Sequence, residues 1–533
     1  MSSLRERACR ASLSSCGLRL ALALCCACLA AACSDDRQQS VSPSPSAPSS
    51  PFRKVTLDPL PGEPISLAVL PDASVLYASR RGQLWWLAAD GTKHDAAQLE
   101  VYSHDEEGLQ GLALAPDFEQ TRWVYLYYSP RLDTPIDDPQ TPALDEGAAP
   151  GVGAPSDWLP FAGVMRLSRF RFEPPLLDLA SEEIVLEVPV DRGLCCHIGG
   201  QLDFDAQGHL YLSTGDDTNP FESGGFAPLD ERVDRHPGFD AQRSAANSND
   251  LRGKLLRIHV EEDGSYTIPE GNLFAPGTAR TRPEIYLMGL RNPFRFSVDR
   301  ERGLIYLADY APDALEASPA RGPVGTGKWT VVREPGNYGW PYCATPGQPY
   351  VAYDFQSGVS GATFDCQHPQ NRSPRNTGVV DLPAVLEPSL TYSYGSTPRW
   401  PALSSGGVAP MAGPAYRFVR DASPYAWPES FAGAPLFYEW ARDFVRAFHL
   451  DAAGELDSME PVLTDLPVDG PIDMEFGPDG ALYVLEYGSA YFTANPQAQL
   501  SRIEYLTPGA DSSAPAAEDA APAGSYSSAS PSQ

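Results

Sequence analysis

One pattern recurs six times along the chain and constrains its fold more than any other feature. Each copy has an alternating run of apolar residues, a turn containing Asp or Gly, and a second run that ends in aromatic or β-branched residues. The clearest copy is Ile472–Tyr487 (IDMEFGPDGALYVLEY); the others lie at residues 65–87, 109–128, 200–215, 295–310 and, more loosely, 415–450. Alternation with a period of two around such a turn predicts a β-hairpin. A lone hairpin cannot bury both faces, so the copies must stack or close into a ring.

The spacing of the copies favours a β-propeller. Six copies between residues 55 and 506 leave about 75 residues each, whereas a four-stranded blade needs about 40–45. The surplus must lie in long loops, such as the Pro/Ala/Asp-rich segment 132–160. We therefore predict an all-β chain whose residues 55–506 form a six-bladed β-propeller with long loops. A β-sandwich with accessory domains is the alternative. In a propeller, loops converge at one end of the central channel, where ligand sites form.

Both ends of the chain differ in composition from this body. Residues 1–33 combine a basic start with an apolar run, and Cys33 follows small residues, as in the signal peptide of a bacterial lipoprotein. A plain secretory signal is the alternative. Residues 34–54 are predicted to be a Pro/Ser-rich tether and residues 507–533 a disordered tail. These segments predict export to the bacterial cell envelope, either periplasmic or anchored to the outer membrane through a lipid at Cys33.

Four of the ten cysteines remain once the predicted signal peptide is removed: Cys195, Cys196, Cys343 and Cys366. An exported protein meets an oxidising compartment, which favours a Cys343–Cys366 disulfide. Cys195 and Cys196 are adjacent, and a disulfide between neighbours is strained and uncommon. Buried thiols are the alternative for these two.

Charge and missing motifs exclude several functions. The formal net charge is −30, and binding nucleic acid requires clustered Lys and Arg to neutralise phosphates. The sequence after the predicted signal peptide has no G-x-x-x-x-G-K-[ST] phosphate loop, no G-x-S-x-G, no C-x-x-C and no H-E-x-x-H. We therefore expect no nucleic-acid partner, and small neutral or cationic ligands remain open.

Three loops beside the predicted hairpins carry residues suited to chemistry. His197 can take a proton from an alcohol, or it can cap a strand edge. Asp216 and Asp217 can hold a metal, hold a sugar hydroxyl, or form only a tight turn. Arg291, followed by Asn292, offers a planar donor for carboxylates and quinone oxygens, or an inter-blade salt bridge. A fourth candidate, Glu106, lies in an acidic loop that is either a polar wall of a site or a solvated surface.

With the segments HIGGQLDF, GLRNPFRF, GNYGWPYC and FGPDGALYVLEYG in view, the chain resembles the glucose/sorbosone dehydrogenase family over roughly residues 55–505. The resemblance implies an exported six-bladed propeller that oxidises an aldose at C1 to the lactone. Hydride would pass to pyrroloquinoline quinone (PQQ) in the presence of calcium. Because the sequence has no C-x-x-C-H haem attachment, electrons would leave to a separate acceptor.

The resemblance also implies roles for individual residues. His197 matches the catalytic base, and Arg291 and Asn292 match a pair that contacts PQQ. Two further positions, Glu106 and Asp217, match contacts to the sugar. Gly322 and Pro323 match a pair whose backbone carbonyls hold calcium, an ion that prefers oxygen ligands.

Several positions depart from the family pattern. Cys196 replaces an Asp that often precedes the catalytic His, and Phe294 replaces a Gln that often lies at the cofactor. Gly470 and Ile472 stand where PQQ-binding relatives carry the two arginines of an R-x-R-D arrangement, of which this chain keeps only Asp473. Other arginines, such as Arg295 or Arg442, would then substitute for the charge that three PQQ carboxylates require. Two other functions therefore stay open. One is a non-catalytic propeller that binds carbohydrate or protein; the other is a metal-dependent lactonase or hydrolase that uses Asp216, Asp217 and Glu106.

Overall fold

The computed structural model describes residues 50–132, 147–489 and 492–506. The predicted signal peptide, most of the predicted tether and the predicted tail at 507–533 lie outside these residues. Within the described part of the chain, no helix is both long enough and apolar enough to cross a membrane.

The described chain is built from six sheets of four or more strands, as predicted. The first three are β2 (Pro64–Val69), β3 (Val75–Ser79), β4 (Gln83–Leu87) and β5 (Lys93–Gln98); β6 (Leu109–Leu114), β7 (Trp123–Tyr128), β8 (Ala162–Glu173) and β9 (Leu176–Asp191); and β10 (Gly199–Phe204), β11 (His209–Thr214), β12 (Lys254–Val260), β14 (Ile285–Met288) and β18 (Gly336–Asn337), with β13 (Tyr266–Thr267) beside β12.

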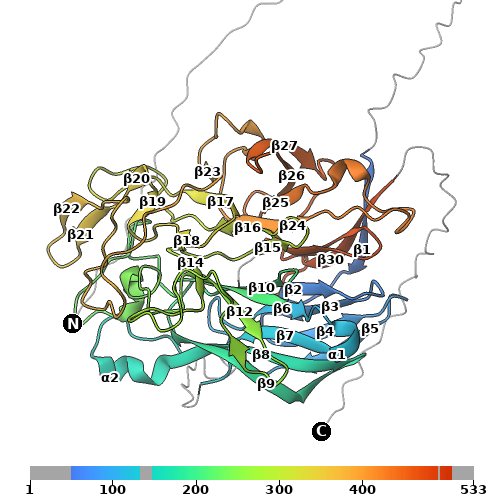
Figure 1. The fold of residues 1–533 in the computed structure, drawn as a ribbon, viewed down its shortest axis with the longest axis horizontal. Coiled ribbons are helices and arrows are strands. Elements are labelled where there is room, and N and C mark those ends of the chain that lie inside the picture. Colours follow the sequence, from blue (N-terminus) through green and yellow to red (C-terminus); the bar gives the residue numbers. More distant parts are fainter. Residues whose placement is uncertain (1–49, 133–146, 490–491, 507–533) are drawn as a thin grey trace, which may run out of the picture. The chain divides into compact units, whose positions relative to one another are not determined.

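The other three sheets continue the order of the chain. They are β15 (Phe296–Asp299), β16 (Leu304–Asp309), β17 (Gly327–Val332) and β23 (Leu390–Tyr392); β24 (Pro410–Ala415), β25 (Pro435–Glu439), β26 (Phe444–Leu450) and β27 (Leu456–Val462); and β28 (Pro471–Phe476), β29 (Leu482–Glu486) and β30 (Gln499–Tyr505), completed by β1 (Phe52–Asp58). The innermost strands β2, β6, β10, β15, β24 and β28 contact one another in this order, and β28 contacts β2. The sheets are therefore the blades of a closed six-bladed β-propeller (Figure 1).

The ring is closed by the two ends of the described chain. The strand β1 pairs antiparallel with β30, from Phe52 opposite Tyr505 to Asp58 opposite Leu500, and the two strands lie side by side in Figure 1. The ring of Phe52 packs against Trp427 and Phe431 as well as Tyr505. Because this contact buries an aromatic side chain, the propeller begins at Phe52 and not at residue 55, which shortens the predicted tether.

The predicted hairpins coincide with blade strands. Ile472–Tyr487 contains β28 and β29, and its turn ends in Gly480, whose φ of 74° suits glycine far better than other residues. The looser copy at 415–450 contains β25 and β26, the second and third strands of the fifth blade. The innermost strand of that blade, β24, is rich in Pro, Ala and Gly and is followed by a long loop, so its hairpin with β25 has no clear alternation.

Loops and short elements account for the surplus length. Two small sheets, β19 (Cys343–Thr345) with β20 (Gln348–Pro349) and β21 (Val351–Asp354) with β22 (Val359–Thr363), lie in the long connection between β17 and β23 of the fourth blade. The Cys343–Cys366 disulfide, with its Cα atoms 6.1 Å apart, joins this region as predicted. The helices are all short: α1 (Phe118–Thr121), α2 (Pro155–Trp158), η1 (Leu159–Phe161), η2 (Pro237–Phe239), η3 (Ala241–Arg243), η4 (Pro401–Leu403) and η5 (Glu429–Phe431).

Candidate active site around His197

His197 lies in the loop between β9 and β10, at one end of the propeller channel. Its carbonyl accepts a hydrogen bond from the Asp217 amide at 3.1 Å, and the Ile198 carbonyl accepts one from the Gly215 amide at 3.0 Å. The backbone ladder of β10 and β11 thus continues into the two loops that carry the candidate residues. His197 and Asp217 both have a positive φ, 68° and 53°, which is costly for a residue other than glycine and must be held by surrounding contacts.

The imidazole of His197 is buried and oriented by a carboxylate. Its Nδ1 lies 2.7 Å from Oδ1 of the fully buried Asp216, and Oδ2 of Asp216 accepts a hydrogen bond from the Trp340 indole at 2.6 Å. A carboxylate only accepts hydrogen bonds, so Nδ1 carries the proton. Nε2 is then the nitrogen that can accept a proton from a substrate.

Arg291 lies on the same cavity as His197. The cavity is closed in this structure and does not admit a water molecule, and its walls include Trp340, Phe226 and Asp313. Arg291 is 4% exposed, and its carbonyl accepts a hydrogen bond from the Asp216 amide at 2.8 Å. Its guanidinium lies 5.9 Å from the Trp340 ring centroid and interacts electrostatically with Asp309, but no ion pair joins it to a carboxylate within the described ranges.

Asn292 joins the loop of Arg291 to that of His197. Its amide donates to Oδ1 of Asp309 at 2.9 Å, and its own Oδ1 accepts a hydrogen bond from the Gly199 amide at 3.1 Å. The loops before β10 and β15 are thereby tied together. The structure thus brings His197, Arg291 and Asn292 to one end of the channel.

Glu106 holds the backbone of the His197 loop. Its Oε2 accepts hydrogen bonds from the amides of His197 at 2.6 Å and Ile198 at 3.3 Å. The side chain is half-buried. Glu106 therefore contacts the candidate catalytic residue directly, and its predicted role as a sugar contact remains a prediction.

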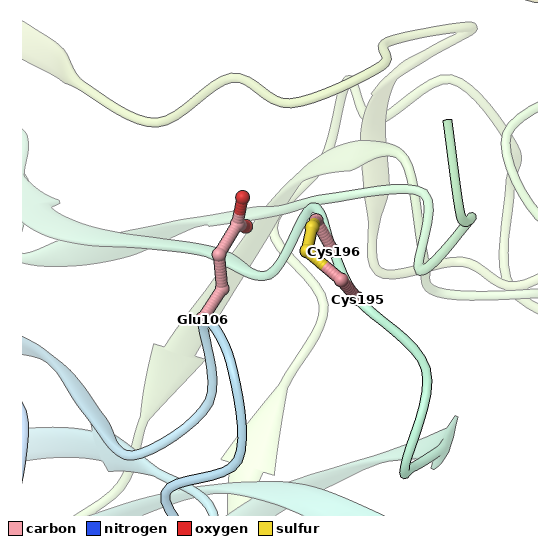
Figure 2. Close-up of side chains that lie close together, drawn as sticks. All are labelled: Glu106, Cys195 and Cys196. Carbon is pink, nitrogen blue, oxygen red and sulfur yellow. A yellow bond between two sulfur atoms is a disulfide. The ribbon is translucent and has the colours of Figure 1, made fainter. Parts of the chain in front are cut away.

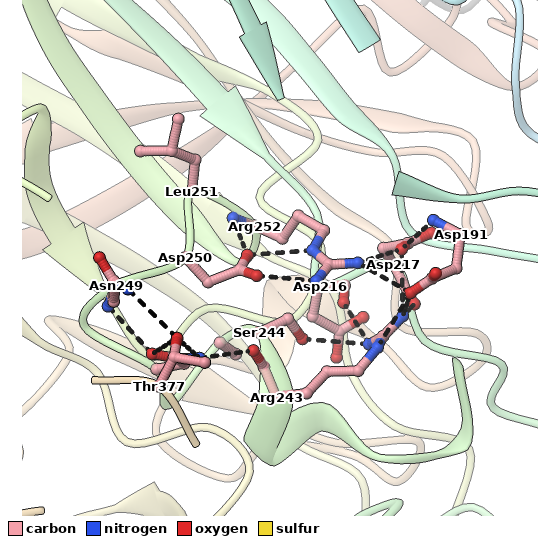
Figure 3. Close-up of polar contacts among 12 residues, drawn as sticks. Asp191, Asp216, Asp217, Arg243, Ser244, Asn249, Asp250, Leu251, Arg252 and Thr377 are labelled. Atoms are coloured by element: carbon pink, nitrogen blue, oxygen red, sulfur yellow. Dashed lines mark hydrogen bonds and ion pairs between the residues drawn. The ribbon is translucent and has the colours of Figure 1, made fainter. Parts of the chain in front are cut away.

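Asp217, the second predicted sugar contact, lies in a buried ion network (Figure 3). Its Oδ2 accepts hydrogen bonds from Arg243 at 3.0 Å and Arg252 at 2.7 Å, and both guanidinium groups also contact Asp191. Burial raises the pKa of Asp217 to about 6, although the two arginines oppose the rise. For Asp191, burial favours a higher pKa, but the charges of Arg243 and Arg252 prevail and lower it. The Asp217 carboxylate is thus occupied by two arginines, and the Asp217 amide donates a hydrogen bond to the His197 carbonyl.

The three carboxylates considered for a hydrolytic metal site do not converge. Asp216 is bonded to His197 and Trp340, Asp217 to two arginines, and Glu106 to two backbone amides. Across the described residues, one group of three or more His, Cys, Asp or Glu side chains has metal-ligand spacing. It consists of Glu106, Cys195 and Cys196. The structure therefore contradicts the predicted metal-ligand set of the hydrolase alternative.

Gly322 and Pro323 lie in the loop after β16, which also supplies Pro312 and Asp313 to the cavity. Neither is among the residues that line it. The Gly322 carbonyl accepts a hydrogen bond from the Ser318 amide at 2.8 Å, and no acidic group with metal-ligand spacing gathers here in the described chain. The Gly322 carbonyl is thus already used by the Ser318 amide, and the role of Gly322 and Pro323 as calcium ligands remains a prediction.

Cys195 and Cys196, which precede His197, are joined by a disulfide in the structure, and both are buried (Figure 2). The alternative of two buried thiols is therefore not the state that the structure shows. The sequence argument weighed the strain of a ring between neighbours. It had no access to the loop path that brings the two sulfur atoms together.

The arginines proposed as substitutes for the missing pair are occupied elsewhere. Arg295 donates hydrogen bonds to the carbonyls of Ile65, Phe294 and Ile472. Arg442 donates to five loop carbonyls: those of Ser393, Leu403, Ser404, Gly406 and Gly407. Both guanidinium groups stabilise loops and strand ends, so the expectation that they supply charge to the cofactor is wrong.

The loop that covers the cavity is anchored by His236. Nδ1 of this buried residue accepts a hydrogen bond from the Gly238 amide at 2.9 Å, and the Gly238 carbonyl accepts one from the Asn219 amide at 2.8 Å. Burial lowers the pKa of His236 to about 4; Asp191 opposes this, and Arg243, Arg235 and Arg375 add to it. A protonated Nδ1 cannot accept the Gly238 hydrogen bond.

We expect this histidine to make the protein sensitive to acid. The unfolded chain takes up the proton below about pH 6.5, but the folded chain does so only near pH 4. The stability is thus complete above pH 6.5, and about 3 kcal/mol is lost as the pH falls from 6.5 to 4. His236→Asn keeps an acceptor for the Gly238 amide and does not titrate. Denaturant unfolding between pH 7.5 and 4 should show a smaller loss for this variant; equal losses would contradict the argument.

Comparison with known proteins places this site in a family. The model of the family described as "Glucose / Sorbosone dehydrogenase" matches residues 62–371, more than half of the chain. The chain belongs to the glucose/sorbosone dehydrogenase family. This confirms the resemblance drawn from the sequence, and the matched range contains three of its four segments, HIGGQLDF, GLRNPFRF and GNYGWPYC.

Proteins that are similar in sequence to this member of the glucose/sorbosone dehydrogenase family carry different functional names. Aldose sugar dehydrogenase YliI of Escherichia coli is 28% identical over 300 residues, which are 56% of this chain and 63% of that protein. Human Hedgehog-interacting protein is 27% identical over 210 residues, 39% of this chain and 24% of its own. The chain thus spans less than two thirds of these relatives. The solved structure of the soluble aldose sugar dehydrogenase of Escherichia coli has the same fold, with a TM-score of 0.54 and 19% sequence identity. The superposed region covers 85% of this chain and 99% of that structure's chain.

Sequence reasoning missed parts of this family member's site. Trp340 lies in the quoted segment GNYGWPYC but was given no role, although it donates to Asp216. Arg243 and Arg252 lie in the long irregular loop between β11 and β12 and at its end, where no periodicity marks them. The available signal in the sequence was the pair of adjacent aspartates, Asp216 and Asp217, followed along the chain by Arg243 and Arg252.

Proposed function

We propose that this protein is a sugar dehydrogenase that oxidises an aldose at C1 to the lactone, with PQQ as the hydride acceptor and a separate electron acceptor downstream. One observation carries the proposal. A buried imidazole whose Nδ1 is fixed on Asp216 shares a cavity with the buried guanidinium of Arg291, which feels the charge of Asp309 but forms no ion pair with a carboxylate of the described residues. A buried, unpaired cation is costly, so an anionic ligand at Arg291 suits the site.

The chain's own residues can perform the acid–base part of this reaction. PQQ, when bound, supplies the acceptor for a hydride. Nε2 of His197 accepts the proton of the sugar hydroxyl, and the adjacent Asp216 carboxylate stabilises the imidazolium that results. Trp340 fixes Asp216, and Glu106 fixes the backbone of His197.

Arg291 is the residue on the cavity wall that would hold the cofactor. Asn292 does not line the cavity and ties the Arg291 loop to Gly199, so its contact with PQQ remains a prediction. One guanidinium can bind one carboxylate through two parallel hydrogen bonds. In this structure the space between these walls does not admit a water molecule, whereas typical cofactor sites have volumes of roughly 300–1,000 Å³. Binding therefore requires the loop of residues 220–228, which forms one wall, to move outward. No step here is routed through calcium.

A PQQ titration of the purified protein tests this proposal. Loss of a charge-assisted hydrogen bond costs about 1.5–3 kcal/mol, so Arg291→Ala should weaken PQQ binding by about ten-fold or more. Arg291→Lys should weaken it less. Arg399, which is exposed and lies over Trp400, provides the matched control Arg399→Ala, which should bind PQQ as the unmodified protein does.

A second function is favoured by one observation. PQQ has three carboxylates, but Arg295 and Arg442 are bound to backbone carbonyls, which leaves Arg291 as the cation on the cavity wall. A non-catalytic propeller that binds carbohydrate would need no further cation. Sugar binding by the purified protein without PQQ binding, and without reduction of a dye by any aldose, would establish this function instead.

A further inference from the structure

The group formed by Glu106, Cys195 and Cys196 is not used by the proposed reaction. One carboxylate oxygen and the two sulfur atoms lie within 4.8 Å of one another (Figure 2). Cys195 is 7% exposed and Cys196 is 6% exposed. A cysteine sulfur binds metals strongly only as a thiolate. In the disulfide form neither sulfur atom is a thiolate. The group is therefore closed to metals as long as the bond between the sulfur atoms exists.

We propose that reduced Cys195 and Cys196, together with Glu106, bind one thiophilic divalent cation such as Zn²⁺ or Cd²⁺, and that the disulfide is the gate of this site. A dithiol reductant opens it: two electrons and two protons pass to the sulfur atoms, the bond between them breaks, and the reductant becomes a disulfide. Binding of the cation then releases the two thiol protons to solvent.

The geometry and the chemistry of the three groups support a single ion. Zn²⁺ binds sulfur at about 2.3 Å and carboxylate oxygen at about 2.0–2.2 Å, so ligand atoms around a tetrahedral ion lie about 3.4–3.8 Å apart. A carboxylate oxygen of Glu106 lies within 4.8 Å of both sulfur atoms. The sulfur atoms are about 2 Å apart in a disulfide, so after reduction they must separate by about 1.5 Å to reach that spacing. Thiolates select soft ions over calcium or magnesium, and three protein ligands leave a fourth position open.

The site would be coupled to the candidate active site. Glu106 accepts the amide hydrogen bonds of His197 and Ile198, and Cys196 is bonded directly to His197 in the chain. A cation that draws on Glu106 therefore changes the support of the His197 loop. The inference does not depend on the proposed dehydrogenase activity, because metal binding is measured without sugar or PQQ.

Cadmium titration of the whole protein tests the inference. The protein is reduced with a trialkylphosphine, freed of reductant without air, and titrated with Cd²⁺ while the ultraviolet thiolate-to-cadmium absorbance and the bound metal are measured. We expect about one Cd²⁺ per reduced chain and none for the oxidised chain. Alkylation of the thiols before titration should abolish binding. Peptide mapping should show that Cd²⁺ protects Cys195 and Cys196 from alkylation, and not Cys343 and Cys366.

Two variants separate the three-ligand site from a simple dithiol. Glu106→Gln should weaken Cd²⁺ binding at least ten-fold, whereas Asp105→Asn, a change in the neighbouring half-exposed carboxylate, should not. Equal binding by the oxidised protein, protection of Cys343 and Cys366 alone, resistance of Cys195 and Cys196 to reduction, or unchanged binding by Glu106→Gln would each overturn the proposal. Alkylation tests the thiols without a cysteine substitution, so the outcome does not depend on a variant that fails to fold.

Discussion

Replacing His197 with alanine is expected to lower kcat for aldose oxidation by about 100-fold to 10,000-fold, the usual contribution of a positioned general base. The imidazole is the group on the cavity wall whose proton position is set by a buried carboxylate. PQQ affinity should change little, because Arg291 and Asn292 remain. The measurement is the steady-state reduction of an artificial dye by a panel of aldoses with PQQ present.

His209→Ala is the matched control for this substitution. His209 lies on β11 of the same blade, and its Nδ1 also contacts an aspartate, Asp205, at 2.8 Å. It is not among the residues that line the cavity, so its loss should leave kcat within about two-fold. If His197→Ala retained full activity, His197 would not be the base. If both variants lost activity equally, the effect would be a general loss of structure.

The blades could be predicted because their signal is local. In Ile472–Tyr487, alternating side chains and a Pro-Asp-Gly turn lie within one short segment, and they form β28 and β29. The closing strand β1 could not be predicted in the same way, because its partner β30 lies at the other end of the described chain. The sequence of Phe52–Asp58 alone does not indicate which strand it pairs with. The first residues of β1 were therefore included in the predicted tether.

The candidate site shows the same division between local and distant information. His197 and Arg291 each precede a predicted hairpin, so strand order alone places both at one end of the channel. The role of Asp217 depends on Arg243 and Arg252, which come from a loop without periodicity. The path of the loop that joins Cys195 to Cys196 was likewise invisible, because the sequence shows only that the two residues are adjacent.

Gly215→Ala is expected to lower the activity by about 100-fold or more without touching any side chain of the site. A Cβ atom at residue 215 would lie 1.9 Å from the carbonyl oxygen of His197 and 2.2 Å from its carbonyl carbon. A side chain could rotate away from such a contact, but these are backbone atoms. The contact is relieved only if the whole His197 loop shifts. A displacement of about 1 Å at a catalytic group costs about 100-fold in rate. Dye reduction measures the loss, and overpacking should also lower the free energy of unfolding by about 1–3 kcal/mol.

Gly395→Ala separates the steric effect from the change of residue type. Nothing lies within 4 Å of a Cβ atom built at residue 395, and its φ is not in the left-handed region, so this variant should keep both activity and stability. The Gly215 amide donates a hydrogen bond to the Ile198 carbonyl, so a shift at residue 215 also moves the start of β10, which follows His197. Gly215→Ala should therefore lose activity while retaining PQQ binding, because Arg291 comes from a different blade. Full activity in Gly215→Ala would show that the His197 loop is free to move and that the close packing of β10 and β11 does not position the imidazole.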